Sequence, residues 1–454
     1  MATKRSILTW LNKMSAARLL LLFYFLAIIL STILLSLPVA YKPEVDIAFI
    51  DILFTAVSAL SVTGLSTITI IDTLSVTGYF FLMIILQLGA VGIMASGTFI
   101  WLLLGKKIGF RERQLIMTDQ NQTTFSGMVQ LIKEIIYVVL LIELAGFLIL
   151  GTYFLKYYST IQEAYLHGLF GTISAISNGG FDITGNSLVP YANDYFVQII
   201  FIILIIFGAI GFPVLIEVKN YLSQKKKKRK RFRFSLFTKV TSVTFAILIS
   251  IGTLFIYLMD MNHYFKGSSW HENLFSALFQ SVTTRSAGLS TLDVSLLTES
   301  NQLFMSGLMF IGASPSSAGG GIRTTTFAIV LIFLITFARG GKSIKIFKRE
   351  IHNDDFIKAV TVTLMAFFLI FVSVIVVSIF EGFSLTEILF EVTSAFGTVG
   401  LSLGITSELS VPSKVILMIL MFIGRVGVIT FLLMFKRTRE ESNYHYPKEK
   451  IIIG

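Results

Sequence analysis

The sequence of 454 residues predicts an all-α membrane protein with eight transmembrane helices, arranged as four copies of one unit. Hydrophobic residues make up 54% of the chain and charged residues only 14%, a balance typical of proteins with several membrane spans. A short motif occurs four times, and long apolar runs stand on both sides of every copy. Together these observations indicate a helical bundle in a bilayer, with pseudo-fourfold symmetry around a central axis.

The repeated motif ends close to a glycine. Three copies align without gaps, at residues 54–66 (FTAVSALSVTGLS), 170–182 (FGTISAISNGGFD) and 390–402 (FEVTSAFGTVGLS). In each of them a Ser-Ala pair begins six residues before the glycine. The fourth copy, LFQSVTTRSAGLS at residues 278–290, has Val282 and Thr283 in place of that pair. The glycines, called the motif glycines below, are Gly64, Gly180, Gly288 and Gly400.

Each copy begins with apolar residues and ends in small and polar ones, which predicts a short helix that stops at the motif glycine. Such a helix is too short to cross a bilayer, so the backbone after it must face protein or a water-filled cavity. Glycine permits positive φ angles and close approach of the backbone there. Four such turns on one axis would surround a pore with carbonyl oxygens, which can replace the hydration shell of a potassium ion. Tight turns between helices would explain one such glycine, but not four in register.

The predicted spans come in pairs, one on each side of a short helix. We expect them at residues 19–41, 73–104, 134–155, 195–217, 240–259, 300–338, 357–380 and 414–435. The first is an uncleaved span, because a signal peptide has a shorter apolar core and a small-residue cleavage site. The four repeats, each made of a span, a pore helix, a filter turn and a second span, then cover residues 1–105, 106–224, 225–340 and 341–454.

The distribution of positive charge predicts the orientation. An even number of spans in each repeat puts the four short helices on the side of the membrane opposite both termini. The side of the termini holds 30 of the 37 Lys and Arg residues, so the positive-inside rule places both termini in the cytoplasm. The run KKKKRKRFR at 225–233 then lies in a cytoplasmic loop, where it either orients the chain and contacts anionic lipids or docks an acidic partner. This distribution explains the net charge of +11 without nucleic acid.

The sequence offers no chemistry for an enzyme. It has no Cys, and its five His residues form no metal-binding pair with a carboxylate. It also contains none of the common nucleophile or nucleotide-binding motifs. We therefore expect neither catalysis nor a covalently bound cofactor.

The sixth span is interrupted by a run of small residues, GASPSSAGGG. Proline removes a backbone donor, and each glycine costs roughly 1 kcal/mol relative to alanine in a helix, so the helix cannot continue through this run. The freed backbone must face a cavity, which we expect beneath the four turns; the alternative is a kink that bulges at the surface. The run consists of Gly312, Ala313, Ser314, Pro315, Ser316, Ser317, Ala318, Gly319, Gly320 and Gly321.

Three arginines fall at membrane depth, where a charge costs at least ~2.5 kcal/mol and is normally paired or faces water. Arg285 stands in the third motif copy, and we expect it to brace the short helix by bonding to carbonyl groups. Arg323 follows the glycines of the sixth span and can be explained as a residue that snorkels to the inner rim. Arg425 interrupts the last span. Glu143, in the third span, is a candidate partner for Arg285 or for another arginine.

These features together resemble the Trk/Ktr/HKT superfamily of potassium uptake proteins, and most closely the bacterial Ktr membrane subunit. The resemblance covers the whole chain and rests on the four repeats, on the turns SVTGLS, SNGGFD, RSAGLS and GTVGLS, and on the stretches GASPSSAGGGIRTTT and GRVG. It implies potassium uptake through a gated selective pore in the plasma membrane of a bacterium. It also implies that potassium binds only at the filter, to backbone carbonyls of Val62, Thr63, Gly64, Asn178, Gly179, Gly180, Ser286, Ala287, Gly288, Thr398, Val399 and Gly400.

The resemblance further implies a gate and partners. In the family the segment that matches residues 312–321 is an intramembrane gating loop, and Arg425 would lie just below the filter, where it either repels potassium or latches the loop. Family members form homodimers on a cytosolic ring of RCK-type subunits that bind ATP or ADP, and sodium either drives or permits uptake. Only Thr398-Val399-Gly400 approaches the TVGYG filter of potassium channels, which predicts one main ion site and imperfect rejection of sodium.

A secondary symporter of potassium with sodium or protons is the alternative, because broken helices at mid-membrane are also typical of carriers that work by alternating access. Those carriers usually have inverted repeats and charged substrate ligands. The predicted repeats here are parallel and their turns carry no charged ligand, which favours the pore.

Overall fold

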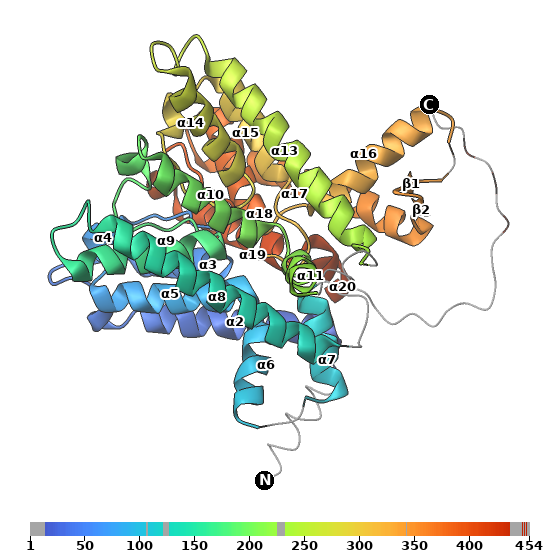
Figure 1. The fold of residues 1–454 in the computed structure, drawn as a ribbon, viewed down its shortest axis with the longest axis horizontal. Helices are drawn as coiled ribbons and strands as arrows, with labels where there is room; N and C mark the ends of the chain where they lie inside the picture. Colours follow the sequence, from blue (N-terminus) through green and yellow to red (C-terminus); the bar gives the residue numbers. More distant parts are fainter. Residues whose placement is uncertain are drawn as a thin grey trace.

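The computed structural model describes residues 14–105, 108–120, 127–224, 232–341 and 343–435, together with the single residues 447, 449 and 451. Residues 225–231 of the basic run lie outside the described part of the chain, as do the basic residues before residue 14. The described helices follow one order four times: a long helix, a short helix, and a pair of helices separated by a break (Figure 1).

The bounds of these four sets are as follows. The first contains α2 (Ala16–Leu35), α3 (Phe49–Leu60), α5 (Val76–Val91) and α6 (Ile93–Leu103). After α7 (Phe110–Asp119), the second contains α8 (Met128–Phe154), α9 (Ile161–Ser177), α10 (Tyr195–Ala209) and α11 (Phe212–Ser223). The third contains α13 (Leu236–Asp260), α14 (Trp270–Thr283), α15 (Glu299–Phe310) and α16 (Thr324–Ala338). The fourth contains α17 (Asn353–Phe380), α18 (Leu385–Gly397), α19 (Val411–Val426) and α20 (Val428–Phe435).

Short elements connect these helices. An antiparallel hairpin of β1 (Lys345–Ile346) and β2 (Arg349–Glu350) joins the third and fourth sets, and it lies with α16 at one edge of the molecule (Figure 1). Single helical turns lie beside the short helices, at η1 (Pro38–Ala40), α4 (Ile70–Thr73), η2 (Val189–Tyr191), η3 (Val294–Leu296) and η4 (Thr406–Glu408). Capping boxes fix the starts of two short helices, Ser269 with Glu272 at α14 and Ser384 with Glu387 at α18.

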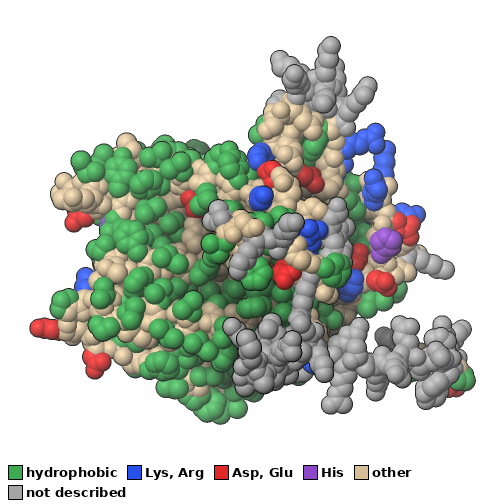
Figure 2. Space-filling model, turned by 90° about the horizontal axis from the view of Figure 1, so that it is seen from below, with side chains coloured by type: hydrophobic (Ala, Val, Ile, Leu, Met, Phe, Trp, Pro, Cys, Tyr) green, Lys and Arg blue, Asp and Glu red, His purple; other side chains and the backbone are tan. Residues whose placement is uncertain are grey.

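Apolar length identifies at least four membrane spans. The helices α2, α8, α13 and α17 are long and apolar enough to cross a bilayer, and the bent pairs α5–α6 and α10–α11 raise the number to six if each pair is one span. The helices within the predicted spans 300–338 and 414–435 are shorter. Hydrophobic side chains cover a broad area of the face in Figure 2, which suits contact with lipid.

The second span of every set is broken, whereas the sequence predicted a break only in the sixth span. Gly92, Gly211 and Gly427 stand at three of the breaks, with φ angles of 96°, 101° and 93°. The chain bends by 99° between α5 and α6, and by 106° between α10 and α11. The breaks within 73–104, 195–217 and 414–435 were therefore not predicted, because a single glycine at positive φ ends the first helix of each pair without a polar run. Pro213 comes after the second break, at the start of α11.

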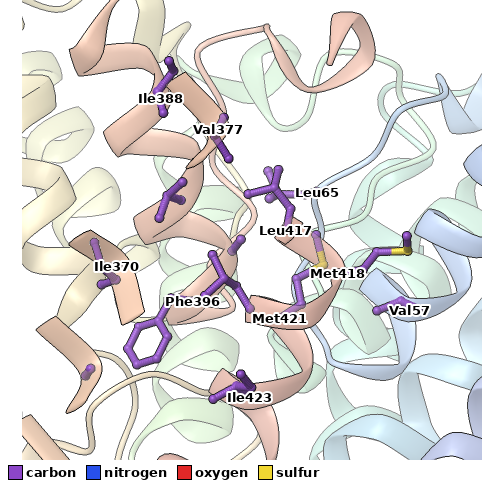
Figure 3. Close-up of a cluster of buried hydrophobic side chains, with 14 of the residues drawn as sticks. Val57, Leu65, Ile370, Val377, Ile388, Phe396, Leu417, Met418, Met421 and Ile423 are labelled. Carbon is purple, nitrogen blue, oxygen red and sulfur yellow. The ribbon is translucent and has the colours of Figure 1, made fainter. Parts of the chain in front are cut away.

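The fourth set of helices packs against the first. A buried hydrophobic cluster joins Val57 of α3 and Leu65 to Leu417 and Met421 of α19 and to Phe396 of α18 (Figure 3). The C-terminal halves of α3 and α18 are buried throughout. This packing brings the end of the first short helix next to the end of the last one.

Candidate functional site

The four short helices end just before their motif glycines, at Leu60, Ser177, Thr283 and Gly397. The predicted stop at the glycine itself was therefore a few residues late, because the turn begins earlier. In every copy the residue two positions before the glycine has a positive φ: 56° at Val62, 55° at Asn178, 88° at Ser286 and 47° at Thr398. The motif glycines also have positive φ, between 69° and 95°. The three residues that end at each glycine, 62–64, 178–180, 286–288 and 398–400, are called the motif turns below.

The left-handed backbone of these turns is strained. For the β-branched residues Val62 and Thr398, such a conformation costs on the order of 1–3 kcal/mol and persists only where the surroundings hold it. The same conformation at the same position in all four copies shows that the turns have one common backbone geometry.

The four motif turns form a closed ring. A Cβ atom added to Gly64 would lie 2.6 Å from the carbonyl oxygen of Gly179, and one added to Gly180 would lie 3.1 Å from that of Ala287. An added Cβ on Gly288 would collide with the carbonyl of Val399, and one on Gly400 with the carbonyl of Thr63. Each turn thus backs onto the next, in the order first, second, third, fourth and first again. The twelve residues predicted to bind the ion are therefore brought together, and all are buried except three partly exposed motif glycines.

Hydroxyl groups of the short helices hold the turns from behind. The N–H of Gly64 donates to Ser58 Oγ at 3.1 Å, and the N–H of Gly400 donates to Ser394 Oγ at 3.0 Å. In the other two copies the hydroxyl donates instead: Ser174 Oγ to the carbonyl of Phe181 at 2.6 Å, and Thr283 Oγ1 to that of Leu289 at 2.5 Å. The Ser-Ala pair was visible in the sequence, but its partner across the turn was not.

The loop 312–321 lies inside the protein and not at its surface, so the alternative of a surface bulge is wrong. All of its residues are buried except Pro315, which is half-buried. Its backbone is bonded to the end of α10, through Ser314 N–H to the carbonyl of Ala209 and Ala318 N–H to that of Gly208, both at 3.0 Å. It also contacts the ring directly, because Gly320 N–H donates to Ser286 Oγ at 3.2 Å.

Arg425 ties the same loop to the end of α5. Its Nη1 donates to the carbonyls of Ser317, at 3.2 Å, Ala318 and Gly319, at 3.3 Å. Its Nη2 donates to the carbonyls of Gly89 and Ala90. The arginine therefore touches the loop through hydrogen bonds, as the latch version of the prediction requires.

The other charged groups at this depth have different partners from those considered in the sequence. Arg323 Nη1 donates to the carbonyl of Gly319, so this residue bonds to the loop and does not simply snorkel. Arg285 is fully buried and donates to the carbonyl of Ile311 at 2.7 Å, at the start of the loop and not in its own helix. Glu143 accepts a hydrogen bond from Gln87, and no arginine pairs with it among the described residues.

Gln120, which directly follows α7, also contacts the loop. The sequence did not indicate this contact. Gln120 Oε1 accepts from Ser316 Oγ at 2.9 Å, while Gln120 Nε2 donates to the carbonyl of Val91 at 2.9 Å. Nothing in the local sequence distinguishes Gln120 from Gln114, because the two partners of Gln120 come from elements distant in the sequence.

The site consists of neutral oxygen atoms. Among the described residues, no group of three or more His, Asp or Glu side chains could hold a metal ion. Carbonyl oxygens suit a weakly held monovalent cation, whose hydration shell they can replace.

Comparisons with known proteins agree on one family. The family model TrkH, described as a cation transport protein, matches residues 12–446. The chain is 57% identical to the Ktr system potassium uptake protein D of Bacillus subtilis, over 98% of both chains. It is 36% identical to the Ktr system potassium uptake protein B of the same organism, over 99% of both chains, and 31% identical to the potassium/sodium uptake protein NtpJ of Enterococcus hirae, over 98% of both.

A solved structure has the same fold. The crystal structure of the potassium transporter TrkH from Vibrio parahaemolyticus matches with a TM-score of 0.70 and covers 91% of this chain and 85% of that one. The identity is 19%, so the likeness concerns the fold alone.

Proposed function

Because this chain belongs to the TrkH family of cation transport proteins, we propose that it is the membrane subunit of a potassium uptake system and conducts potassium through the ring of motif turns. The observation that carries the proposal is the closed ring, in which each motif glycine backs onto a carbonyl of the next turn. The names of the relatives, which are potassium uptake proteins, support the choice of ion.

In this proposal the ring is the selectivity filter of an eight-span bundle with pseudo-fourfold symmetry, divided into the four repeats predicted above. The backbone carbonyls of the motif turns take the place of water around the ion. The turns share one backbone geometry but differ in side chains, and only the fourth has the sequence Thr-Val-Gly. Fewer identical carbonyl layers hold fewer ions, so one main site and incomplete rejection of sodium follow.

The loop 312–321 is the gate, and Arg425 is its latch. The loop meets Ser286 of the third turn from one side and is bonded to α5 through Arg425 from the other. Breaking these bonds would free a segment of small residues, which can move without displacing large side chains. The open state therefore requires Arg425 to release the carbonyls of the loop.

Regulation would come from other chains. Two relatives are named as parts of a Ktr system, which supports a partner subunit, and we propose a cytosolic RCK-type ring that binds ATP or ADP beneath a homodimer of this chain. The name of the relative NtpJ, a potassium/sodium uptake protein, supports a role for sodium. The protein would lie in the bacterial plasma membrane with both termini in the cytoplasm.

The proposal is tested by flux. The protein is purified with its cytosolic RCK-type partner and reconstituted in liposomes. When the partner is activated by nucleotide, potassium should pass at well above ~10³ ions per second, which is faster than the usual turnover of enzymes. A slower, saturating exchange that is strictly coupled to sodium or protons would favour the symporter. No potassium flux in folded protein would refute both.

A further inference from the structure

A second layer of four equivalent turns lies immediately beyond the ring. The residue two positions after each motif glycine accepts a hydrogen bond from the backbone N–H two residues further on. The four side chains and donors are Ser66 with Ile68 (3.3 Å), Asp182 with Thr184 (3.0 Å), Ser290 with Leu292 (3.3 Å) and Ser402 with Gly404 (2.9 Å). Asp and Ser commonly form such local turns, and here they repeat with the motif.

In the third and fourth copies, a buried side chain of the short helix holds this outer turn. Gln280 Nε2 donates to Ser290 Oγ at 2.6 Å, and Glu391 accepts from Ser402 Oγ. Glu391 also accepts from Thr406 Oγ1 at 3.0 Å. Gln280 is fully buried and Glu391 is 2% exposed. An amide and a carboxylate thus hold equivalent serines, the amide as a donor and the carboxylate as an acceptor.

The comparison of Gln280 with Glu391 separates two roles of the carboxylate, which are holding the outer turn and supplying a charge. Burying a carboxylate is costly, and hydroxyl donors offset that cost only in part. Because the uncharged Gln280 holds the equivalent serine of the third copy, holding an outer turn does not require a carboxylate. When it is ionised, Glu391 adds a negative charge behind the fourth turn.

The charge lies close to the proposed ion path. Ser402 is two residues beyond Gly400, so the carboxylate bonded to it lies within roughly 10 Å of that glycine. The order of the ring puts the fourth turn opposite the second, whose own outer residue is Asp182. The outer layer therefore has carboxylates on two opposite sides, one in the layer and one behind it.

Resting on the proposed function, we infer that Glu391 sets the affinity of the pore for potassium at its outer end. It does not touch the ion; its charge acts through the fourth turn, whose outer segment its two hydrogen bonds hold in place. The chemistry is attraction of a small cation by a buried carboxylate at short range, which water screens weakly.

The test is E391Q, which keeps the size of the side chain and an amide oxygen that can accept from Ser402 Oγ. We expect the potassium concentration for half-maximal uptake to rise about five- to tenfold, with the maximal rate and the melting temperature retained. The matched control is E387Q on the same helix, where a glutamine can still form the capping box, and it should behave as wild type. Wild-type half-saturation in E391Q would overturn the inference.

The reciprocal change places a carboxylate on the third short helix, α14, instead of the fourth, α18. Q280E should lower the half-saturating concentration, and the double variant Q280E/E391Q should return it towards wild type, which loss of a purely structural brace would not do. If E391Q does not fold, Q280E decides alone, and an unchanged half-saturation in it refutes the role of charge. Absence of potassium uptake in the wild-type protein would instead refute the proposed function itself.

Discussion

At the scale of single residues, the motif glycines tolerate no side chain. The atoms that an added Cβ would meet are backbone atoms of the neighbouring turn, which cannot swing aside as a flexible side chain can. Gly288 and Gly400 also have positive φ, at 74° and 95°. Space and conformation therefore exclude a larger residue for independent reasons.

We expect Gly288→Ser or Gly400→Ser to degrade the preference for potassium over sodium about tenfold, because strain of 1–3 kcal/mol must be relieved by moving carbonyls of the ring. The measurement is competitive uptake of the two ions in liposomes. Gly307→Ser is the control, since Gly307 lies on α15 with no atom within 4 Å of an added Cβ. Full potassium preference in both turn variants would argue against the ring as the filter.

Arg425 is the residue whose removal should open the pore. Each charge-assisted hydrogen bond contributes about 1.5–3 kcal/mol, and Arg425→Ala removes those that join the loop to α5. Basal potassium entry should rise about tenfold, with unchanged ion preference, because the filter is not altered. Arg425→Lys should give a smaller rise, since one ammonium cannot span both sets of carbonyls.

The measurement for Arg425 is potassium flux per amount of folded protein, with Arg339→Ala at the exposed end of α16 as the control. A structural ion pair with Glu143 would instead predict loss of folded protein. That hypothesis has no support in the structure, because Glu143 is bonded to Gln87. Wild-type flux in both Arg425 variants would contradict the latch.

At the scale of elements, the loop 312–321 is a meeting point of the breaks in the other three sets. It is bonded to α5 through Arg425, to α10 through its own backbone, and to the segment after α7 through Ser316. Of the three break glycines, Gly211 lies directly against the loop, because a Cβ added to it would lie 2.9 Å from the carbonyl oxygen of Pro315. The loop therefore has direct contacts with elements of the other three sets.

We expect Gln120→Ala to raise basal flux about two- to tenfold, because a net hydrogen bond contributes about 0.5–1.5 kcal/mol and Gln120 joins Ser316 to Val91. Gln114→Ala on the exposed side of the same helix is the matched control. Potassium flux is measured with and without the proposed cytosolic RCK-type partner. Equal flux in the two variants would mean that α7 does not stabilise the closed loop.

At the scale of the whole molecule, the four motif copies and the break in the sixth span were predictable, and the other three breaks were not. The motif fixes the register of four turns because its glycines stand at the same position in every copy. Gly92 and Gly97 look alike in one apolar run, yet only Gly92 ends a helix. Its φ of 96° and its contact with Asp119 depend on a distant helix, so local sequence could not separate the two. The bracing by Glu391 was hidden for the same reason.

An ion pair also joins the first and fourth sets of helices, whose turns are neighbours in the ring. Lys414 Nζ of α19 lies 2.8 Å from Asp51 Oδ1 of α3, and the two side chains are only 9% and 18% exposed. Together with the hydrophobic cluster of Figure 3, this ion pair joins the fourth set to the first. Removing one partner leaves a largely buried charge without its counter-ion.

We therefore expect Lys414→Met to destabilise the folded protein by about 3 kcal/mol, and the double variant Lys414→Met/Asp51→Leu to recover most of that loss, because the unpaired charge is then gone. Thermal unfolding in one detergent measures both, and the double-mutant cycle isolates the pair. Lys358→Met is the control, since Lys358 and Asp355 form an exposed pair on α17 whose loss should change stability by less than about 1 kcal/mol.

If the ring needs the Lys414–Asp51 pair to close, Lys414→Met should also lower the preference for potassium over sodium, and the double variant should restore it. A destabilised Lys414→Met variant with full ion preference would show that the hydrophobic cluster alone holds the first and fourth turns together.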